Sequence, residues 1–436
     1  MERERVGFNR PFFVLIFLQP MRKLTLIILI AALSACQNKE PNADNKDTSI
    51  KLLQNGEWRF SLKIENEELP FNVELSNVAS KDPKAVILNG DERIESSQVT
   101  IKADSIWIRL PVFDTELRGK IESQNLITGF WINKTRQNYS IPFVAEYNKN
   151  FRFTPAKTST VIKDRYHVIF GPNSEDQWDA ILLLNQNPNK ITGTFITETG
   201  DYRYLEGNIM NDKLYLSTFD GSHAFLFHAD IDGDSLINGS FVSGIHYQAD
   251  WLGNADTTFT LRKPQDLTYL KEGYEYLDFK LPNENGDTVT WDDMNLANKV
   301  VIVDIMGSWC PNCMDASASL KELTASYNSD EIEILPIAFE LTSDLDAARK
   351  RIFKMQSDLG MKKKFLFGGY VSKEKAADTF PMLNKIMSYP TLIFIGKDRE
   401  IKQIYTGFYG PGTGTYYTEF MSNTKKLLDR LVAEEG

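Results

Sequence analysis

KVVIVDIMGSWCPNC, residues Lys299–Cys313, carries the pattern that decides the fold of the C-terminal part of the chain. Its apolar run, Val300–Ile305, in which only Asp304 is polar, is typical of a strand that is buried on both faces of a parallel or mixed sheet. A Gly-Ser pair interrupts the run, and the apolar positions after Cys310 recur every three or four residues, as in an amphipathic helix. The stretch therefore predicts a strand-to-helix junction with Cys310 and Cys313 at the start of the helix.

The two cysteines of this junction have the spacing of a redox-active pair. A helix N-terminus carries partial positive charge and free N–H groups, which stabilise a thiolate in the first turn. Cys310 gains most from this position, and the two intervening residues place Cys313 one helical turn away, close enough for a disulfide. We therefore expect Cys310 to attack a substrate disulfide and Cys313 to resolve the product. A lone C-x-x-C also fits half of a zinc site, so the pair needs further support.

Further residues give this part of the chain a resemblance to a known superfamily. Trp309 directly precedes the first cysteine, Asp304 lies six residues before it, and Tyr389-Pro390 precedes an apolar, strand-like run. Together with the cysteine pair, they resemble the thioredoxin superfamily, in particular its TlpA/ResA-like branch of membrane-tethered, exported thiol-disulfide oxidoreductases. The resemblance covers about Gly273–Gly436 and implies an α/β thioredoxin-like fold.

The resemblance also implies roles for single residues. Cys310 and Cys313 would alternate between a dithiol and a disulfide, and Asp304 would accept and return the proton of Cys313. Pro390 would follow a cis peptide bond and offer backbone edges to the incoming substrate strand. Supporting positions would be Trp309, Pro311, Asn312 and Tyr389. Glu340 could line the same crevice, although a surface or loop acid is the favoured interpretation.

The chain departs from the TlpA/ResA-like pattern after the second cysteine. Such proteins usually carry Glu three residues and Pro five residues later, where this chain has Ala316 and Ala318. The glutamate normally tunes thiol ionisation. Asp315 lies about 100° further round the helix, so it is no evident replacement. The redox potential of the pair is therefore left open by the sequence.

The rest of the C-terminal region predicts the order β-α-β-α-β-α-β-β-α. After the junction strand and helix, strands are expected at residues 332–338, 365–368, 392–395 and 402–406, and helices at residues 344–359, 373–383 and 416–433. The third strand-helix pair is the usual insertion of the family.

The region from Gly56 to Lys263 alternates apolar and polar residues in short segments between turn residues, which predicts antiparallel sheets. It also repeats itself, since the Phe-Asp pair at 113 recurs at 219 and the Leu-Ile pair at 126 recurs at 236. We therefore predict a multidomain chain, with two related β-meanders or barrels at residues 51–155 and 156–265 and a thioredoxin-like domain at residues 272–436. The β-rich region would be either a partner-gripping module or a spacer.

The N-terminal segment resembles a bacterial lipoprotein signal. Met21 begins a short basic start, an apolar stretch follows, and Leu33-Ser34-Ala35 precedes Cys36. Residues 1–36 are thus expected to be a signal, with Met21 as the natural start and Cys36 as the lipidated residue; a secretory signal with an incidental cysteine is the alternative. Residues 37–50 are polar and predict a tether. We expect the body to face the periplasm from the cell envelope, with the outer membrane favoured.

Composition excludes some classes of function. The net charge of -10 and the lack of clustered Lys and Arg argue against nucleic-acid binding. With three cysteines and four histidines in 436 residues, and no histidine after His246, no metal site is expected. His223 and His228, five residues apart in a strand-like run, are interpreted as core or surface residues.

The prediction from sequence is an extracytoplasmic thiol-disulfide oxidoreductase without a cofactor, for which the resemblance favours a reductase of protein disulfides over an oxidase or isomerase. Its partners would be protein thiols and disulfides, and a membrane electron carrier would reduce it again. Two alternatives stay open: a lipoprotein whose β-rich region binds a partner, and a carrier that holds Cu(I) or zinc on the two thiols.

Overall fold

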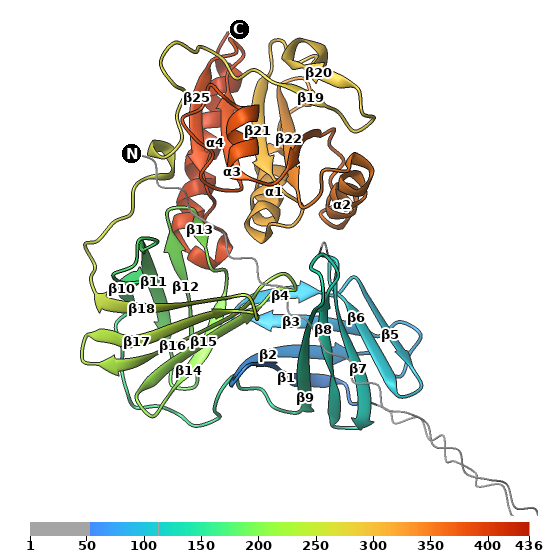
Figure 1. Cartoon of the computed structure of the whole chain (residues 1–436), viewed down its shortest axis with the longest axis vertical. Helices are drawn as coiled ribbons and strands as arrows, with labels where there is room; N and C mark the ends of the chain where they lie inside the picture. The colour runs from blue at the N-terminus through green and yellow to red at the C-terminus, as the bar shows by residue number, and fades with distance from the viewer. Residues whose placement is uncertain (1–52, 112, 436) are drawn as a thin grey trace, which may run out of the picture. The chain divides into compact units, whose positions relative to one another are not determined.

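The computed structural model describes residues 53–111 and 113–435, and Cys36, the expected tether and Met21 lie outside them. All described residues belong to one compact unit, Ile50–Gly436. The β-rich region comes first along the chain and the helices come last (Figure 1).

Nine antiparallel strands form the first sheet, because apolar and polar residues alternate along them. In β6, Ile106 and Ile108 are buried whereas Arg109 is exposed. The sheet has the order β4-β3-β2-β1-β9-β8-β7-β6-β5. Its strands are β1 (Gly56–Ile64), β2 (Glu67–Ser76), β3 (Lys84–Asn89), β4 (Glu92–Glu95), β5 (Gln98–Lys102), β6 (Ser105–Arg109), β7 (Thr115–Ser123), β8 (Leu126–Asn133) and β9 (Tyr139–Tyr147).

The second sheet also has nine strands, and eight of them close into a barrel. Its order is β11-β10-β18-β17-β16-β15-β14-β12-β13, and β11 pairs with β12 to complete the ring. The strands are β10 (Arg165–Phe170), β11 (Trp178–Gln186), β12 (Ile191–Thr197), β13 (Gly200–Asp201), β14 (Leu205–Met210), β15 (Lys213–Phe219), β16 (Ala224–Asp232), β17 (Ser235–Ser243) and β18 (Tyr247–Ala255).

The two sheets share one strand order. The run β3-β2-β1-β9-β8-β7-β6-β5 of the first sheet corresponds to β12-β11-β10-β18-β17-β16-β15-β14 of the second. The repeated sequence segments lie at equivalent places, in or beside β6 to β8 and β15 to β17. The repeat is thus matched by topology, but only the second copy closes.

Residues of the second sheet complete the core of the first. Phe219, from the end of β15, packs on Phe71 with ring centroids 4.2 Å apart and meets Trp131 at 5.0 Å. Leu226 and Val242 join the same buried cluster. The two β units are therefore packed together and not separate.

The C-terminal domain is built on a mixed five-stranded sheet with the order β23-β22-β21-β24-β25. Figure 1 shows its strands between helices. β22 and β23 run parallel to β21, whereas β24 runs antiparallel to it. The elements are β21 (Val300–Met306), α1 (Pro311–Thr324), β22 (Ile332–Glu340), α2 (Leu345–Asp358), β23 (Leu366–Tyr370), α3 (Lys373–Thr379), β24 (Thr391–Ile395), β25 (Ile401–Thr406) and α4 (Thr415–Ala433).

Both faces of this sheet are covered, which explains why every residue of β21 except Asp304 is apolar. All seven residues of β21 are buried. Val300 and Ile302 pack with α1 and α4, whereas Val301 and Val303 face the opposite core. The strand therefore holds the start of α1 on a rigid base.

Short elements connect the β-rich region to this sheet. They are η1 (Pro264–Asp266), the hairpin of β19 (Lys280–Pro282) and β20 (Thr288–Thr290), and η2 (Trp291–Met294); η3 (Pro411–Thr413) precedes α4.

The order of elements in the C-terminal domain is the one that the sequence predicts, with shifts of more than one residue at the ends of α3, β22 and β23. α3 ends at Thr379 and not at residue 383, because Pro381 follows and Phe380 leaves the helical conformation. β22 continues to Glu340, two residues past the predicted end. The second shift changes the interpretation of Glu340, described below.

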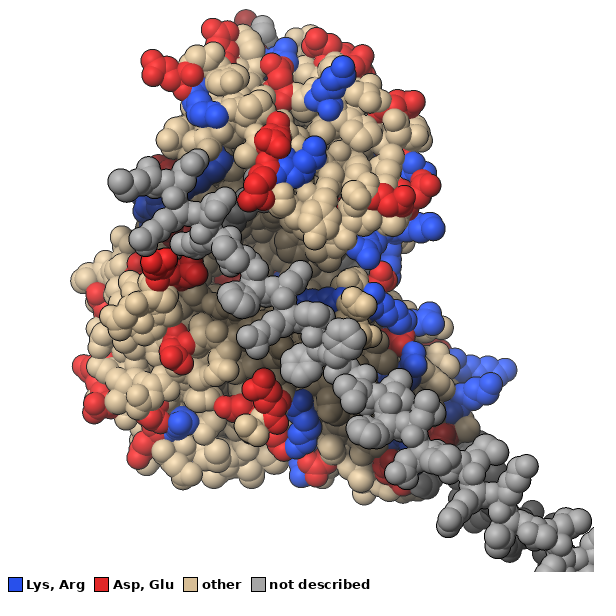
Figure 2. Space-filling model, in the orientation of Figure 1, with Lys and Arg blue, Asp and Glu red and all other residues tan. Residues whose placement is uncertain are grey.

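Acidic and basic side chains are interspersed over the face of the described residues that Figure 2 shows. Within residues 53–111 and 113–435, no helix has the length and apolar character needed to cross a membrane.

Candidate active site

The two thiols lie at the junction between the end of β21 and the start of α1. Cys310 is the N-cap of α1 in an extended conformation, and Pro311 occupies the first helical position, where a missing N–H costs nothing. The Cys310 sulfur accepts a hydrogen bond from the backbone N–H of Cys313 at 3.2 Å. The Cys310 sulfur therefore takes the place of the side-chain oxygen that usually caps a helix, at the positive end of the helix dipole.

The two thiols differ in burial. Cys310 is 6% exposed and Cys313 is fully buried, and both carry free thiols. Burial raises the pKa of the Cys313 thiol, and the neighbouring Cys310 and the charge of Asp304 add to this effect. Cys310 is thus the thiol that a partner can reach, and Cys313 is held protonated until a base acts on it.

Asp304, in β21, is a buried acid below the helix start. It is 1% exposed, and its Oδ2 accepts a hydrogen bond from Ser317 on α1 at 3.2 Å. Its Oδ1 has no hydrogen-bond partner among the described residues. Burial raises the pKa of this carboxyl to about 7, against the opposing effect of Ser317. A group with this pKa can exchange a proton near neutral pH.

The loop before β24 faces the first cysteine. The Tyr389-Pro390 bond is cis, as the resemblance implies, and the Cys310 thiol lies 3.4 Å from the Tyr389 carbonyl oxygen, to which it donates. The Trp309 ring lies 5.7 Å from the Tyr389 ring, and its Nε1 donates to the carbonyl oxygen of Phe339 at 2.9 Å. Trp309 and Tyr389 thus form one wall around the sulfur of Cys310.

Glu340 is not the surface or loop acid that the sequence favoured. It is completely buried, and its two carboxylate oxygens accept hydrogen bonds from the backbone N–H and the hydroxyl of Ser308, each at 2.7 Å. Burial raises its pKa, whereas the bonds from Ser308 lower it. Glu340 therefore supports the turn two residues before Cys310 and does not line a crevice.

The register of the sheet explains this placement. β21 and β22 are parallel, with Met306 opposite Ala338. Two residues further on, Ser308 comes opposite Glu340. If β21 and β22 are assumed to be parallel and their register is extended by two residues, Ser308 and Glu340 are predicted to be neighbours.

The positions after Cys313 carry no glutamate beside the thiols. Ala316 is buried and Ala318 is exposed. Asp315 is bound by Arg203 of the β-rich region, with Nη1 and Oδ2 2.6 Å apart. Asp315 therefore does not take the place of the glutamate beside the thiols.

One turn of the β-rich region contacts the dithiol loops, which no pattern in the sequence indicates. This turn, residues 198–203, lies between β12 and β14 and includes β13. The Ser388 hydroxyl donates to the carbonyl oxygen of Thr199 at 2.7 Å, and Nδ2 of Asn312 donates to that of Asp201 at 3.3 Å. The backbone N–H of Gly410 donates to Oδ2 of Asp201 at 2.6 Å. Both the C-x-x-C motif and the cis-proline loop are thus in contact with the β-rich region.

His223 and His228, the two histidines considered from the sequence, each contact a carboxylate. His223 lies 3.1 Å from Asp220, and His228 lies 3.1 Å from Glu67. His223 precedes β16 rather than sharing its strand with His228. Across residues 53–111 and 113–435, no cluster of His, Cys, Asp and Glu has the composition of a metal site.

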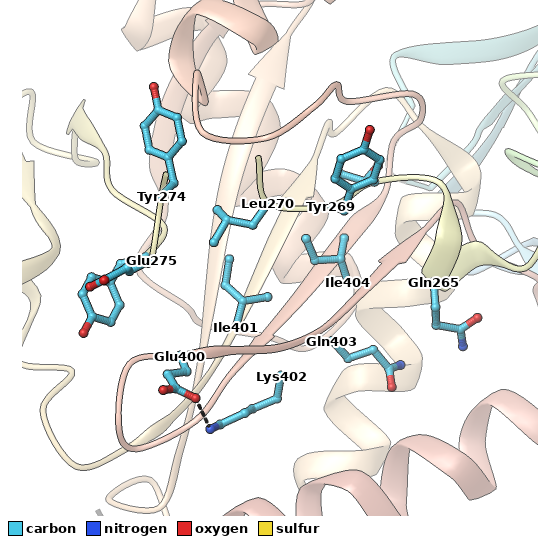
Figure 3. Close-up of a pocket in the computed structure, with 12 residues that line it drawn as sticks. Gln265, Tyr269, Leu270, Tyr274, Glu275, Glu400, Ile401, Lys402, Gln403 and Ile404 are labelled. Atoms are coloured by element: carbon cyan, nitrogen blue, oxygen red, sulfur yellow. Dashed lines mark hydrogen bonds and ion pairs between the residues drawn. The ribbon is translucent and has the colours of Figure 1, made fainter. Parts of the chain in front are cut away.

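One cavity of the described residues lies away from the thiols. It has a volume of about 590 Å³ and runs beside β25, with Leu270, Ile401 and Ile404 at its base and Tyr269 and Tyr274 beside them (Figure 3). None of the candidate site residues lines it.

Comparison with known proteins agrees with this geometry. Residues 273–404 match the AhpC/TSA family. No curated protein matches the chain. The matched segment contains the dithiol, Asp304 and Pro390, and it supports a thiol-disulfide oxidoreductase with a thioredoxin-like domain.

Solved structures resemble about a third of the chain. A thiol-disulfide oxidoreductase from Bacteroides fragilis is 22% identical, with 34% of this chain and 99% of that chain covered and a TM-score of 0.26. A DsbF homologue from Corynebacterium diphtheriae is 18% identical, with coverages of 40% and 99% and a TM-score of 0.28. A thiol-disulfide isomerase from Corynebacterium glutamicum is 14% identical, with coverages of 38% and 100% and a TM-score of 0.27.

Proposed function

We propose that this protein is an extracytoplasmic reductase of protein disulfides that works through the Cys310–Cys313 dithiol. The observation that carries the proposal is the cap of α1, where the Cys310 sulfur accepts the N–H of Cys313. This N–H points at the sulfur that would attack, and the thiolate is the nucleophile of disulfide exchange. Cys313, one turn further and fully buried, is suited to resolve and not to attack.

The reaction balances without a further reactant. The Cys310 thiolate attacks one sulfur of the partner disulfide, so that a mixed disulfide forms and the other partner sulfur leaves as a thiolate and takes up a proton. The Cys313 thiolate then attacks the Cys310 sulfur, and the second partner sulfur leaves as a thiolate. Two electrons pass to the partner, which becomes a dithiol, and Cys310 and Cys313 become a disulfide.

Asp304 is the base for the second step. The Cys313 proton must leave before its sulfur can attack, and burial keeps that thiol protonated. Burial also gives Asp304 a pKa of about 7, so its carboxylate is available at neutral pH and can return the proton afterwards. In this proposal Pro390 belongs to the catalytic residues, and Trp309, Pro311, Asn312 and Tyr389 are supporting residues. Glu340 positions the turn through Ser308.

The location and the recharging of the enzyme belong to the same proposal. The signal-like N-terminus supports export, with Cys36 as the lipidated residue and the outer membrane favoured. The TlpA/ResA-like motif residues support re-reduction by a membrane electron carrier. Labelled fatty acid supplied to cells should be incorporated into the wild-type protein and not into Cys36→Ser, which should be released from the membrane fraction.

The redox potential tests the direction. Equilibration of the purified protein with mixtures of reduced and oxidised glutathione gives the fraction of the Cys310–Cys313 disulfide at each ratio. A potential well below that of the glutathione couple supports a reductase. A potential well above it contradicts this direction and favours an oxidase, and a protein that forms no disulfide contradicts the proposal altogether.

A further inference from the structure

One flank of the dithiol is covered by the turn of residues 198–203. Gly200 lies so near the motif that a Cβ at this position would be 2.4 Å from Nδ2 of Asn312. A Cβ on Gly407, in the loop after β25, would lie 2.7 Å from the backbone of Thr199. Together with the bond from Ser388 to Thr199, these contacts leave no room for a partner segment between the turn and the cis-proline loop.

The other flank is hollow. A cavity of about 360 Å³, here called the Trp309-side cavity, begins at Ser308 and Trp309. Its walls come from both parts of the molecule, because the β6–β7, β8–β9 and β15–β16 loops face α2 and the end of β23 across it. The side chains that matter here are Phe113, Arg136, His223, Trp309, Arg351 and Tyr370.

This cavity reaches the dithiol through two aromatic residues. Phe113 and Trp309 both pack against the buried cluster that contains Cys310 and Cys313. Tyr370, at the opposite wall, is 53% exposed. A segment in the cavity would therefore rest on aromatic surface directly beside the residue that precedes Cys310.

The charges that line the cavity favour an anion. Arg351, on α2, has an Nη1 atom that is buried and has no hydrogen-bond partner among the described residues. Neither Arg351 nor Arg136 forms an ion pair with a described carboxylate, although Arg136 lies over the Tyr139 ring at 5.2 Å. A buried guanidinium nitrogen without an acceptor is costly, and a ligand carboxylate would satisfy it.

Acidic groups near the cavity do not cancel these two charges. Asp114 is exposed at the wall. Asp220 is bound to His223 and Arg203. Glu340 lies behind the wall and accepts hydrogen bonds from Ser308, and the charge of Arg351 lowers its pKa without a hydrogen bond between the two side chains. The unpartnered Nη1 of Arg351 and the exposed guanidinium of Arg136 therefore remain as donors to an anion in the cavity.

We propose that the Trp309-side cavity binds the part of the substrate next to its disulfide and prefers substrates that carry a carboxylate there. The inference rests on the proposed function, because it names the substrate class of the same dithiol. It assigns recognition to residues of the β-rich region as well as to α2, and it makes Arg136 and Arg351 specificity-determining residues.

Matched disulfide substrates test this preference. Two disulfide-containing peptides would differ at one position only, with Glu in one and Gln in the other beside a cysteine. Oxidised glutathione would be the third substrate, a small disulfide that carries carboxylates. The purified full-length protein would be kept reduced with dithiothreitol. Its rate of disulfide reduction would be measured for wild type, Arg136→Gln, Arg351→Gln and Lys350→Gln. Lys350 is an exposed cation of α2 that does not line the cavity, so its variant controls for net charge.

We expect wild type and Lys350→Gln to reduce the Glu peptide roughly tenfold faster than the Gln peptide, the factor that corresponds to one charge-assisted hydrogen bond. Each arginine variant should lose most of this preference, because its rate falls more on the Glu peptide than on the Gln peptide. Arg136 is exposed, so its variant is expected to fold even if Arg351→Gln does not. If the arginine variants lose rate on oxidised glutathione but not on the Glu peptide, the preferred carboxylate is that of a small disulfide.

Two results would overturn the inference and leave the proposed function intact. One is equal rates on the two peptides in wild type, and the other is an equal loss on both peptides in the arginine variants. If wild type reduces none of the three disulfides, the proposed function itself is wrong.

Discussion

Nη1 of Arg203, in the β-rich region, lies 2.6 Å from Oδ2 of Asp315, five residues after Cys310 on α1. The same guanidinium contacts Glu92 of β4 at 2.6 Å and Asp220 at 3.4 Å. Burial acts to lower the pKa of Arg203, but the three carboxylates outweigh it and raise the pKa. One buried cation thus joins both β units to the helix that carries the dithiol.

Replacement of Arg203 should therefore be strongly destabilising. Arg203→Met leaves three carboxylates near one another without their counter-charge, and loss of one partner from a buried pair costs about 3–5 kcal/mol. Arg262→Met is the control, because Arg262 is exposed and pairs with Glu198 at the surface. Its effect should stay below about 1 kcal/mol. Urea unfolding of both variants measures the difference, and equal effects would contradict the role given to Arg203.

Asp304 should make stability depend on pH. Its pKa is raised by burial from 3.8 to about 7 in the folded protein, so the folded state holds a proton that the unfolded state releases above about pH 4. The contribution of this group to stability is therefore present below pH 4 and is lost as the pH rises towards 7.

Asp304→Asn removes this dependence. Relative to wild type, the variant should gain on the order of 2–4 kcal/mol in unfolding free energy at pH 8, and the gain should shrink towards zero near pH 4. Asp330→Asn, at an exposed turn, is the control and should show no such trend. Thermal or urea unfolding between pH 4 and pH 8 gives the curve, and a flat difference would mean that the buried acid does not titrate in this range.

Glu340 should be needed for the turn before the dithiol. Glu340→Leu leaves the buried N–H of Ser308 without an acceptor, which costs about 1–3 kcal/mol in unfolding free energy. Ser308→Ala removes only the hydroxyl bond and keeps the backbone bond, so it should cost less. Unfolding of both variants ranks the two bonds, and a larger loss in Ser308→Ala would contradict this order.

Gly200 should control access to Cys310 through the turn. A Cβ there would lie 2.4 Å from Nδ2 of Asn312, and φ is +145°, so Gly200→Ala should displace the turn from the motif. A loss of about 1 kcal/mol from the contact would speed alkylation of Cys310 by iodoacetamide roughly fivefold. Gly233→Ala is matched, since Gly233 also has a positive φ but no atom near its missing Cβ. An equal increase in both variants would show a general loosening and not a local one.

The dithiol could be predicted because its determinants are local. The apolar run of β21, the break at Gly307 and the spacing of Cys310 and Cys313 lie within fifteen residues, and each specifies its own conformation. The residues that support the dithiol come from further away. Glu340 reaches Ser308 only through the parallel pairing of β21 with β22, and an acidic residue at a strand end has no pattern that tells a buried position from an exposed one.

The contact of the β-rich region with the dithiol could not be predicted from the sequence for a similar reason. Arg203 and Asp315 are 112 residues apart, and nothing near either residue indicates its partner. The strand alternation predicted β-meanders, but closure of the second one depends on the pairing of β11 with β12, which is set by the curvature of the whole sheet. Local patterns thus specify the elements, whereas packing between them specifies the neighbours of the active site.

The place of Phe219 has a consequence for how the chain matures. Phe219 of β15 packs on both Phe71 and Trp131 of the first sheet, and the buried cluster that they belong to extends to Val242. During synthesis, the first sheet must therefore leave this surface open while roughly a hundred more residues are added, a time of about 5–20 seconds at ordinary elongation rates. A chaperone that shields exposed aromatic surface would act in this interval, before the thiols have been made.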